Sequence, residues 1–172
     1  TTENEDDSTG NEDDLLLIQG LESTPDGGVV IFGSCAEAQF AGYPERVGDE
    51  NTWGFFVAKL SSDGVFDWVV DVECNQPNSY TGHPDSGRNW LTVDDSGNIF
   101  ILEKLNSSDG TGTLEIDGSE IYSSQSANDT LLFHFSPTGS LESVTNLFES
   151  SNAFGYLSTT HGGDFDIQHI AA

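Results

Sequence analysis

Positive charge is scarce in this chain: four Lys or Arg residues stand against 30 Asp or Glu among 172 residues, for a formal net charge of −26 at pH 7. A surface of that sign repels nucleic-acid phosphates and anionic membranes, and it attracts cations and cationic partners. It also keeps a protein soluble in concentrated salt, because ions screen the repulsion between carboxylates. We therefore expect no nucleic acid among its partners, and a salty, halophilic environment.

Methionine and long apolar runs are absent. The longest uninterrupted candidates, "LLLI" at 15–18 and "FFVA" at 55–58, fall far short of the roughly 20 residues that cross a bilayer. The sequence therefore predicts no membrane insertion. It begins at Thr1 without a secretory signal, which predicts a processed or excised N-terminus. We expect an extracellular or cell-surface protein.

Only two cysteines are present, Cys35 and Cys74, and each follows a β-prone run. Neither belongs to a CxxC or Cys/His pattern of the kind that binds zinc or performs redox chemistry. An even pair in an exported chain predicts one disulfide between them. Two buried thiols are the alternative.

Catalytic patterns are missing as well. The four histidines form no HxH or HExxH arrangement, and no GxSxG or phosphate-binding loop occurs. Arg46 and Arg88 are the only arginines, which are too few for an arginine cluster that would bind the carboxylates of acidic sugars. We expect a protein that is not an enzyme and has no cofactor other than, at most, calcium. The alternative is that the chain is part of a propeller enzyme that acts on a polysaccharide.

What the sequence does contain is a pattern of short strands and turns. Residues 1–14 carry seven acids and no large apolar side chain, which predicts a disordered acidic linker. After it, the apolar runs are short, β-branched or aromatic, and bounded by Gly, Asp, Ser or Asn. That pattern is typical of an all-β fold.

An internal repeat organises these strands. "PDGGVVIF" at 25–32 is echoed by "DSGNIFIL" at 95–102, an offset of 70, and "FFVAKLSSDGVFDW" at 55–68 by "TLLFHFSPTGSLES" at 130–143, an offset of 75. The extra residues of the second copy predict a small hairpin with Asp117-Gly118 at its turn. Each copy supplies four predicted strands: 15–22, 28–34, 53–60 and 65–72, then 89–94, 98–104, 129–135 and 140–147.

Four antiparallel strands per repeat are the unit of a β-propeller blade. We therefore divide the chain into a first blade at 15–82, a second at 83–160 and the start of a third at 161–172, where "QHIAA" resembles "NWLTV" at 89–93. Two blades cannot close a ring of about four to eight. The predicted fold is a propeller fragment or an open propeller-like assembly of blade-like repeats.

The residues carry a family resemblance. "D-x-G-N-I-F" at 95–100 and "F-V-A-K-L-x-x-D-G-x-x-x-W" at 56–68 resemble the seven-bladed β-propeller repeat, or SBBP repeat, of secreted bacterial and archaeal proteins. The resemblance covers about residues 20–147, with His134 and Ser143 in place of the usual Lys and Trp. It implies a blade fold and a secreted or surface-attached parent protein, and no catalytic residues.

Several residues are candidates for binding or modification. Acidic loops suggest calcium, which prefers carboxylate and carbonyl oxygens, at Asp94 and Asp95 and at Asp164 and Asp166. Asx turns explain the first pair without a metal. Tyr43 and Tyr80 are expected in loops, where they can contact a partner. Two sequons place candidate glycosylation sites at Asn106 and Asn128.

The repeat assigns structural roles to five residues. Lys59 and His134 occupy equivalent positions, with their stems on apolar neighbours. The repeat-matched acids Asp67 and Glu142 are their predicted partners on the adjoining strands. Trp68 is predicted to pack between blades.

These observations predict a non-enzymatic binding module or scaffold whose partners are proteins, glycans or cations. A structural or filament-forming subunit is the alternative, in which an incomplete strand pairs with a second copy of the chain or with further repeats.

Overall fold

The computed structural model describes residues 16–35, 38–44, 46–47, 54–74, 79–82, 90–107, 112–124, 128–148, 154–159 and 165–171. The linker predicted at 1–14 lies outside these residues. Every regular element described is a β-strand, and the fold is all-β, as predicted. In chain order the strands are β1 (Leu16–Ser23), β2 (Val29–Cys35), β3 (Ala38–Gln39), β4 (Arg46–Val47), β5 (Gly54–Leu60), β6 (Phe66–Cys74), β7 (Ser79–Gly82), β8 (Leu91–Val93), β9 (Ile99–Ser107), β10 (Gly112–Ile116), β11 (Ser119–Ser124), β12 (Asn128–Phe135), β13 (Leu141–Phe148), β14 (Phe154–Thr159) and β15 (Phe165–Ala171).

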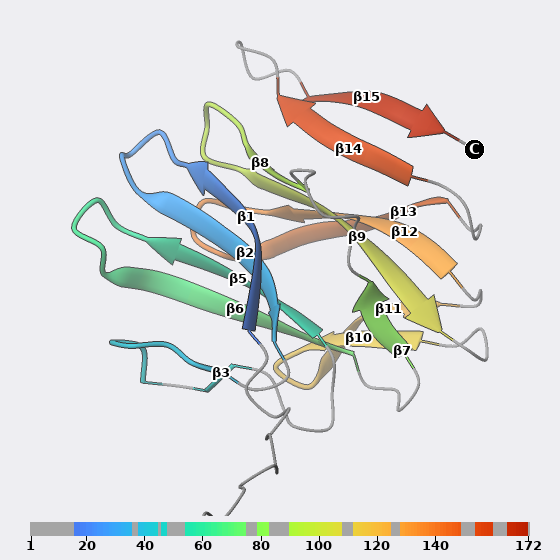
Figure 1. Ribbon diagram of the computed structural model, residues 1–172, viewed down its shortest axis with the longest axis horizontal. Coiled ribbons are helices and arrows are strands. Elements are labelled where there is room, and N and C mark those ends of the chain that lie inside the picture. The colour runs from blue at the N-terminus through green and yellow to red at the C-terminus, as the bar shows by residue number, and fades with distance from the viewer. Residues whose placement is uncertain are drawn as a thin grey trace, which may run out of the picture.

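Two antiparallel sheets form the body of the protein (Figure 1). Sheet 1 has the order β1-β2-β5-β6-β10-β11, and its first four strands are the first repeat. Sheet 2 has the order β13-β12-β9-β7, with β8 also paired to β9, and contains the second repeat. The sheets do not close into a barrel. The hairpins β3–β4 and β14–β15 form two further sheets of two strands each, which share no strand pairing with sheets 1 and 2.

The two repeats share one strand register. Val29 pairs with Leu60 in sheet 1, and Ile99 pairs with Phe135 in sheet 2, which are the same positions of the repeat. A register shift follows Lys59 between β5 and β6, and an equivalent shift follows His134 between β12 and β13. The two sheets are therefore copies of one backbone design.

The turns that close these hairpins also share one design. In each, a glycine N–H donates to the carbonyl three residues before it, and the turn's first N–H donates to the fifth residue's carbonyl, at 2.8–3.0 Å. The glycine has a φ of +77° to +85°, which favours a residue without a Cβ. These glycines are Gly27, Gly64, Gly97 and Gly139. They explain why strand ends were predictable from sequence.

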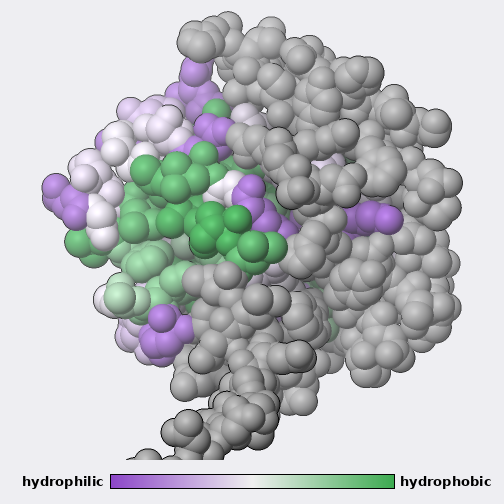
Figure 2. Space-filling view, viewed as in Figure 1, coloured by the Kyte–Doolittle hydropathy of each residue, from purple (hydrophilic) through white to green (hydrophobic). Residues whose placement is uncertain are grey.

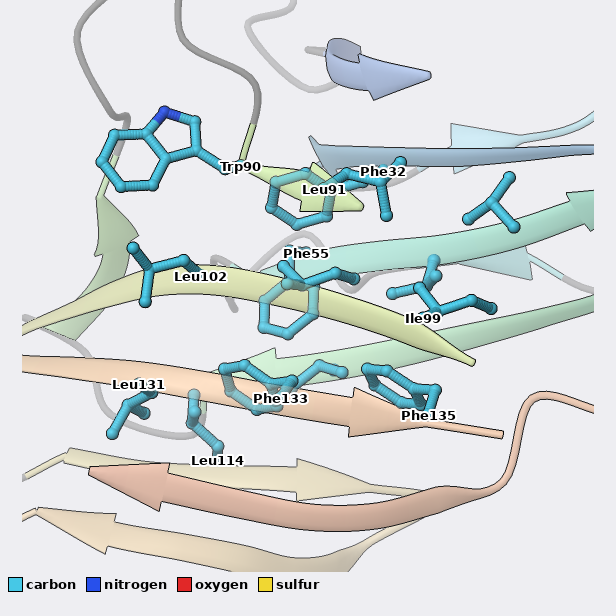
Figure 3. Close-up of a cluster of buried hydrophobic side chains, with 14 of the residues drawn as sticks. Phe32, Phe55, Trp90, Leu91, Ile99, Leu102, Leu114, Leu131, Phe133 and Phe135 are labelled. Carbon is cyan, nitrogen blue, oxygen red and sulfur yellow. The ribbon is translucent and has the colours of Figure 1, made fainter. Parts of the chain in front are cut away.

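The core lies between the two sheets (Figure 3). Phe55 of sheet 1 meets Phe133 of sheet 2 edge to face, with ring centroids 5.0 Å apart, and also meets Phe32 at 5.6 Å. A smaller cluster on the outer face of sheet 1 joins Phe56 and Ala58 to Val47 of β4 and Phe40. Aromatic side chains thus fill both faces of β5.

The predicted small hairpin is found as β10–β11. Asp117 and Gly118 both have positive φ, as a tight two-residue turn requires. β10 leaves the second repeat and pairs with β6 of the first, through Leu114 with Cys74 and Glu115 with Glu73. The second repeat is therefore joined to the first by backbone hydrogen bonds as well as by the core.

The predicted Cys35–Cys74 disulfide is wrong. Cys74 is a buried thiol in the core. Cys35 ends β2, and β5 lies between β2 and β6, so the two backbones are separated by about two strand spacings of 4.8 Å. A disulfide needs Cα atoms within about 7 Å of each other. The side chain of Cys35 lies outside the described residues.

Candidate functional site

Lys59 lies at the end of β5 and is only 8% exposed. Its Nζ donates to Oδ2 of Asp26 at 2.5 Å and lies 3.7 Å from Oδ2 of Asp67. The predicted partner Asp67 is therefore confirmed, although Asp26 in the β1–β2 turn is the closer one. Asp26 could have been found from its position in the predicted β1–β2 turn, because the β2–β5 register places that turn beside the end of β5.

The surroundings of Lys59 are those of a packing residue. A small cavity of about 90 Å³ beside it is lined by turns of both sheets, including Pro25, Gly97 and Pro137. The hydrogen bond from Lys59 is the largest of the interactions that hold the pKa of Asp26 well below its ordinary value. The ion pair thus ties the β1–β2 turn to β5.

Replacing Lys59 tests that structural role. Lys59→Met keeps most of the apolar stem and should cost about 1 kcal/mol or less, because Asp26 stays solvated. Lys59→Ala also removes the stem and should cost about 1–2 kcal/mol more. Urea unfolding measures both. Equal losses for both variants would contradict a role for the stem.

The same ion pair should make the free energy of unfolding depend on pH. Because folding lowers the pKa of Asp26, the ion pair stabilises the fold above the ordinary aspartate pKa, and this contribution is lost as the pH falls below it. Lys59→Met should remove this loss of stability in acid.

His134 occupies the Lys59 position of sheet 2 but contacts a different group. Its ring stacks on Phe100, with centroids 4.6 Å apart and an interplanar angle of 12°. Its Nε2 is buried and has no hydrogen-bond partner among the described residues. The predicted partner Glu142 is exposed. An aromatic neighbour has replaced the expected acid, because position 100 is Phe where the first repeat has Val30.

Trp68 packs between the two sheets, as predicted. Its Nε1 donates to the carbonyl oxygen of Pro137 at 3.2 Å. A Cβ built on Gly139 would lie 2.8 Å from Cδ2 of the indole, so the ring sits directly on this glycine. Trp68 thus anchors β6 to the β12–β13 turn of sheet 2.

The calcium candidate at 94–98 is an Asx turn. Asp94 accepts hydrogen bonds from the N–H of Ser96 at 2.9 Å and from the N–H and side-chain amide of Asn98 at 2.8 Å each. Asp95 is exposed. Within the described part of the chain, no three His, Cys, Asp or Glu residues are grouped to hold a metal ion. Asp164 and the side chain of Asp166 on β15 lie outside it.

Tyr80, Asn106 and Asn128 fall in one row of sheet 2. Tyr80 pairs with Asn106 across β7 and β9, and Asn106 pairs with Asn128 across β9 and β12. Tyr80 is therefore on a strand, and its predicted loop position is wrong. The side chains of all three lie outside the described residues. The two predicted glycosylation sites occupy directly opposed positions, about 5 Å apart at the backbone.

Tyr43 is in a loop, as predicted, between β3 and β4. Its ring meets that of Phe66 at 5.9 Å, and its carbonyl oxygen accepts from the side-chain amide of Gln39 at 2.6 Å. Tyr43 lines a groove of about 380 Å³ beside β6. Three acids, Asp71, Glu73 and Asp117, line the same groove, together with the Gly139–Leu141 segment of sheet 2. We call this feature the β6 groove.

One edge of β6 borders the β6 groove. β6 pairs with β5 from Phe66 to Val72 on one side. On its other side, the described strands pair with it only through Glu73 and Cys74, where β10 attaches. β10 ends at Ile116, so no described strand pairs with residues 66–70 of β6 on the side that faces the acids of the groove. The sequence could not reveal this edge, because it depends on where the inserted hairpin docks.

Two buried carboxyl groups were not anticipated from the sequence. Glu103 on β9 is 3% exposed, and its Oε2 has no hydrogen-bond partner among the described residues. Burial raises the pKa of Glu103 well above its ordinary value. Asp129 on β12 is 1% exposed but accepts from Tyr122 at 2.8 Å and from Ser124, and Asn146 in turn donates to Tyr122 at 2.9 Å. Asp129 is satisfied, whereas Glu103 is a cost to folding.

The described residues include no helix long and apolar enough to cross a membrane. Comparison with known proteins gives no family assignment: no protein-family model, no curated protein and no solved structure matches this chain.

Proposed function

We propose that the chain is a non-enzymatic binding module that takes an extended, basic segment of a partner protein into the β6 groove. The open edge of β6 carries the proposal, since it can add one further strand in line with β10. Main-chain hydrogen bonds to this edge would supply affinity. Asp71, Glu73 and Asp117 would select Lys or Arg side chains, and Tyr43 offers a rigid aromatic contact.

The rest of the molecule supports a scaffold role. The cations and acids whose partners are described mostly hold the fold together: Lys59 joins a turn to β5, Asp94 closes its own turn, and Asp129 holds the β10–β11 hairpin. The net charge of −26 favours cationic partners in general, while the groove gives them one place to dock. The SBBP-like pattern and the acidic surface support a secreted or surface location in salty surroundings.

Binding of a labelled peptide tests the proposal. The probe is about seven residues long, enough to span residues 66–70 of β6, and alternates Lys with Thr. Fluorescence anisotropy should show binding that weakens as salt rises. A second peptide of equal charge, N-methylated at alternate amides so that it cannot pair with a strand edge, should not bind. Equal binding of both peptides would rule out strand addition and leave only general attraction of charge.

Variants locate the contact. Asp117→Asn removes a charge and keeps the left-handed turn conformation, which Asn tolerates. Asp117→Asn and Glu73→Gln should each weaken binding about two- to five-fold. Glu120→Gln is the matched control, because Glu120 is exposed on β11 and does not line the groove. If the control weakens binding as much, the peptide is not in the β6 groove.

A further inference from the structure

One row of side chains on sheet 1 is exposed at its β1 end, although the equivalent position in sheet 2 is buried. Leu21 pairs with Ile31, Ile31 with Ala58 and Ala58 with Val69, so these residues form one row across the outer face of sheet 1. The equivalent row of sheet 2 is Leu91, Ile101, Phe133 and Val144. Leu91 is 0% exposed, whereas Leu21 is 61% exposed.

Leu91 is buried and Leu21 is exposed because of the way the two sheets stack. Leu91, Ile101 and Phe133 are buried because the inner face of sheet 1 packs on them. On the outer face of sheet 1, the β3–β4 segment covers the β5–β6 half through Phe40 and Val47. The other half is left open, and Ile18 and Leu21 are 49% and 61% exposed there. Figure 2 shows an apolar area over the place where β1 and β2 lie in Figure 1. We call Ile18, Leu21 and Ile31 the β1 strip.

The repeat indicates what fits this strip. Sheet 2 follows sheet 1 in the stack, and the β14–β15 hairpin lies beyond sheet 2, where β14 contacts β8 and β9 (Figure 1). β14 begins 75 residues after β7, the offset of the second half of the repeat, so the hairpin starts a third layer. In sheet 2, the face with Leu91, Ile101 and Phe133 packs on sheet 1, and the opposite face is on the side of the β14–β15 hairpin. The β1 strip lies on the face of sheet 1 that a preceding layer would cover, and the β14–β15 hairpin belongs to the layer that follows sheet 2.

We infer that the β1 strip binds the β14–β15 end of a second copy of this chain, so that copies associate head to tail. Such a contact is heterologous, and it extends to a ring or an open chain and not to a closed two-fold dimer. The β14–β15 hairpin lies at the same end of the stack as the β1 strip, because β1 and β14 both contact β8. The contact joins sheet faces, in contrast to the strand exchange that the sequence left open as an alternative.

Association should depend on salt. Each copy carries a formal charge of −26, so copies repel one another in dilute buffer. In about 1 M sodium chloride the screening length falls to about 3 Å and the apolar contact can form. Sedimentation equilibrium up to about 1 mM protein should then show species of increasing size. A monomer throughout this range would overturn the inference.

A matched pair of variants tests the surface. Leu21→Glu should weaken association at least about tenfold, because it places a charge where a leucine is to be buried. Val65→Glu is the control: Val65 is also 61% exposed, but its repeat counterpart Ser140 is exposed in the existing stack. Circular dichroism checks that both remain folded. If both variants weaken association equally, or neither does, the β1 strip is not the contact.

Cross-linking tests the direction. A photoreactive amino acid at position 21, in a mixture of isotopically light and heavy protein, should give mixed-isotope links from position 21 to residues 154–171. Mixed links between the β1–β2 regions of two copies would show a symmetric contact instead. That result, or the absence of mixed links, would overturn head-to-tail association.

Discussion

Gly139→Ala is expected to destabilise the protein by about 2–5 kcal/mol. Gly139 has a φ of +85°, where an alanine costs about 1–2 kcal/mol. The added Cβ would also lie 2.8 Å from the Trp68 ring, and relieving that overlap costs about 1–3 kcal/mol. The indole cannot retreat easily because its Nε1 is bonded to Pro137.

The repeat provides a control for this variant. Gly64 occupies the same turn position in sheet 1 with a φ of +77°, and a Cβ there meets no atom within 4 Å. Gly64→Ala should therefore cost only the backbone part, about 1–2 kcal/mol. Urea unfolding of both variants measures the difference. Equal losses would mean that Trp68 does not press on the β12–β13 turn.

Glu103→Leu is expected to stabilise the protein by about 1–3 kcal/mol at neutral pH. The carboxyl group is buried without a partner for Oε2, and its strand neighbours Ile101, Leu105 and Leu131 are apolar. Leucine removes the penalty of burying that group and adds apolar contact. Glu103→Gln should gain less, since a buried amide also requires hydrogen bonds.

The pH dependence has a definite sign. Folding raises the pKa of Glu103, so the folded protein holds this proton at pH values where the unfolded chain has released it. The contribution of Glu103 to stability is therefore greatest below the ordinary glutamate pKa and falls as the pH rises toward the raised folded pKa. Unfolding free energies measured from pH 4 to pH 8 should show a decline that is weaker in both variants. An unchanged slope would show that Glu103 does not titrate in this range.

Most of the fold could be predicted from the sequence because the repeat marks it twice. The strands predicted at 53–60 and 140–147 are found at Gly54–Leu60 and Leu141–Phe148, since each ends in a turn whose glycine requires positive φ. β7 was missed because "SYTG" has no apolar alternation of its own. It is a strand only because β9 offers it an edge, which is a tertiary effect.

The errors about the site also arose because the site depends on tertiary contacts between strands. The proposed disulfide failed because the order of strands in sheet 1 places β5 between the two cysteines. Asp26 was missed as the partner of Lys59 because the two residues are 33 positions apart in the chain. The open edge of β6 depends on the docking of β10, which no local pattern encodes. Local spacing predicted the elements, whereas contacts between elements required the structure.

The most direct test of the proposed function is a map of the peptide contact by nuclear magnetic resonance. Backbone amide signals of the protein would be followed while the alternating Lys-Thr peptide is added. The account predicts that the largest shifts fall on residues 66–73, on the turn at 117–118 and on residues 139–141, around the β6 groove. Shifts spread evenly over exposed acids, or concentrated away from β6, would contradict it.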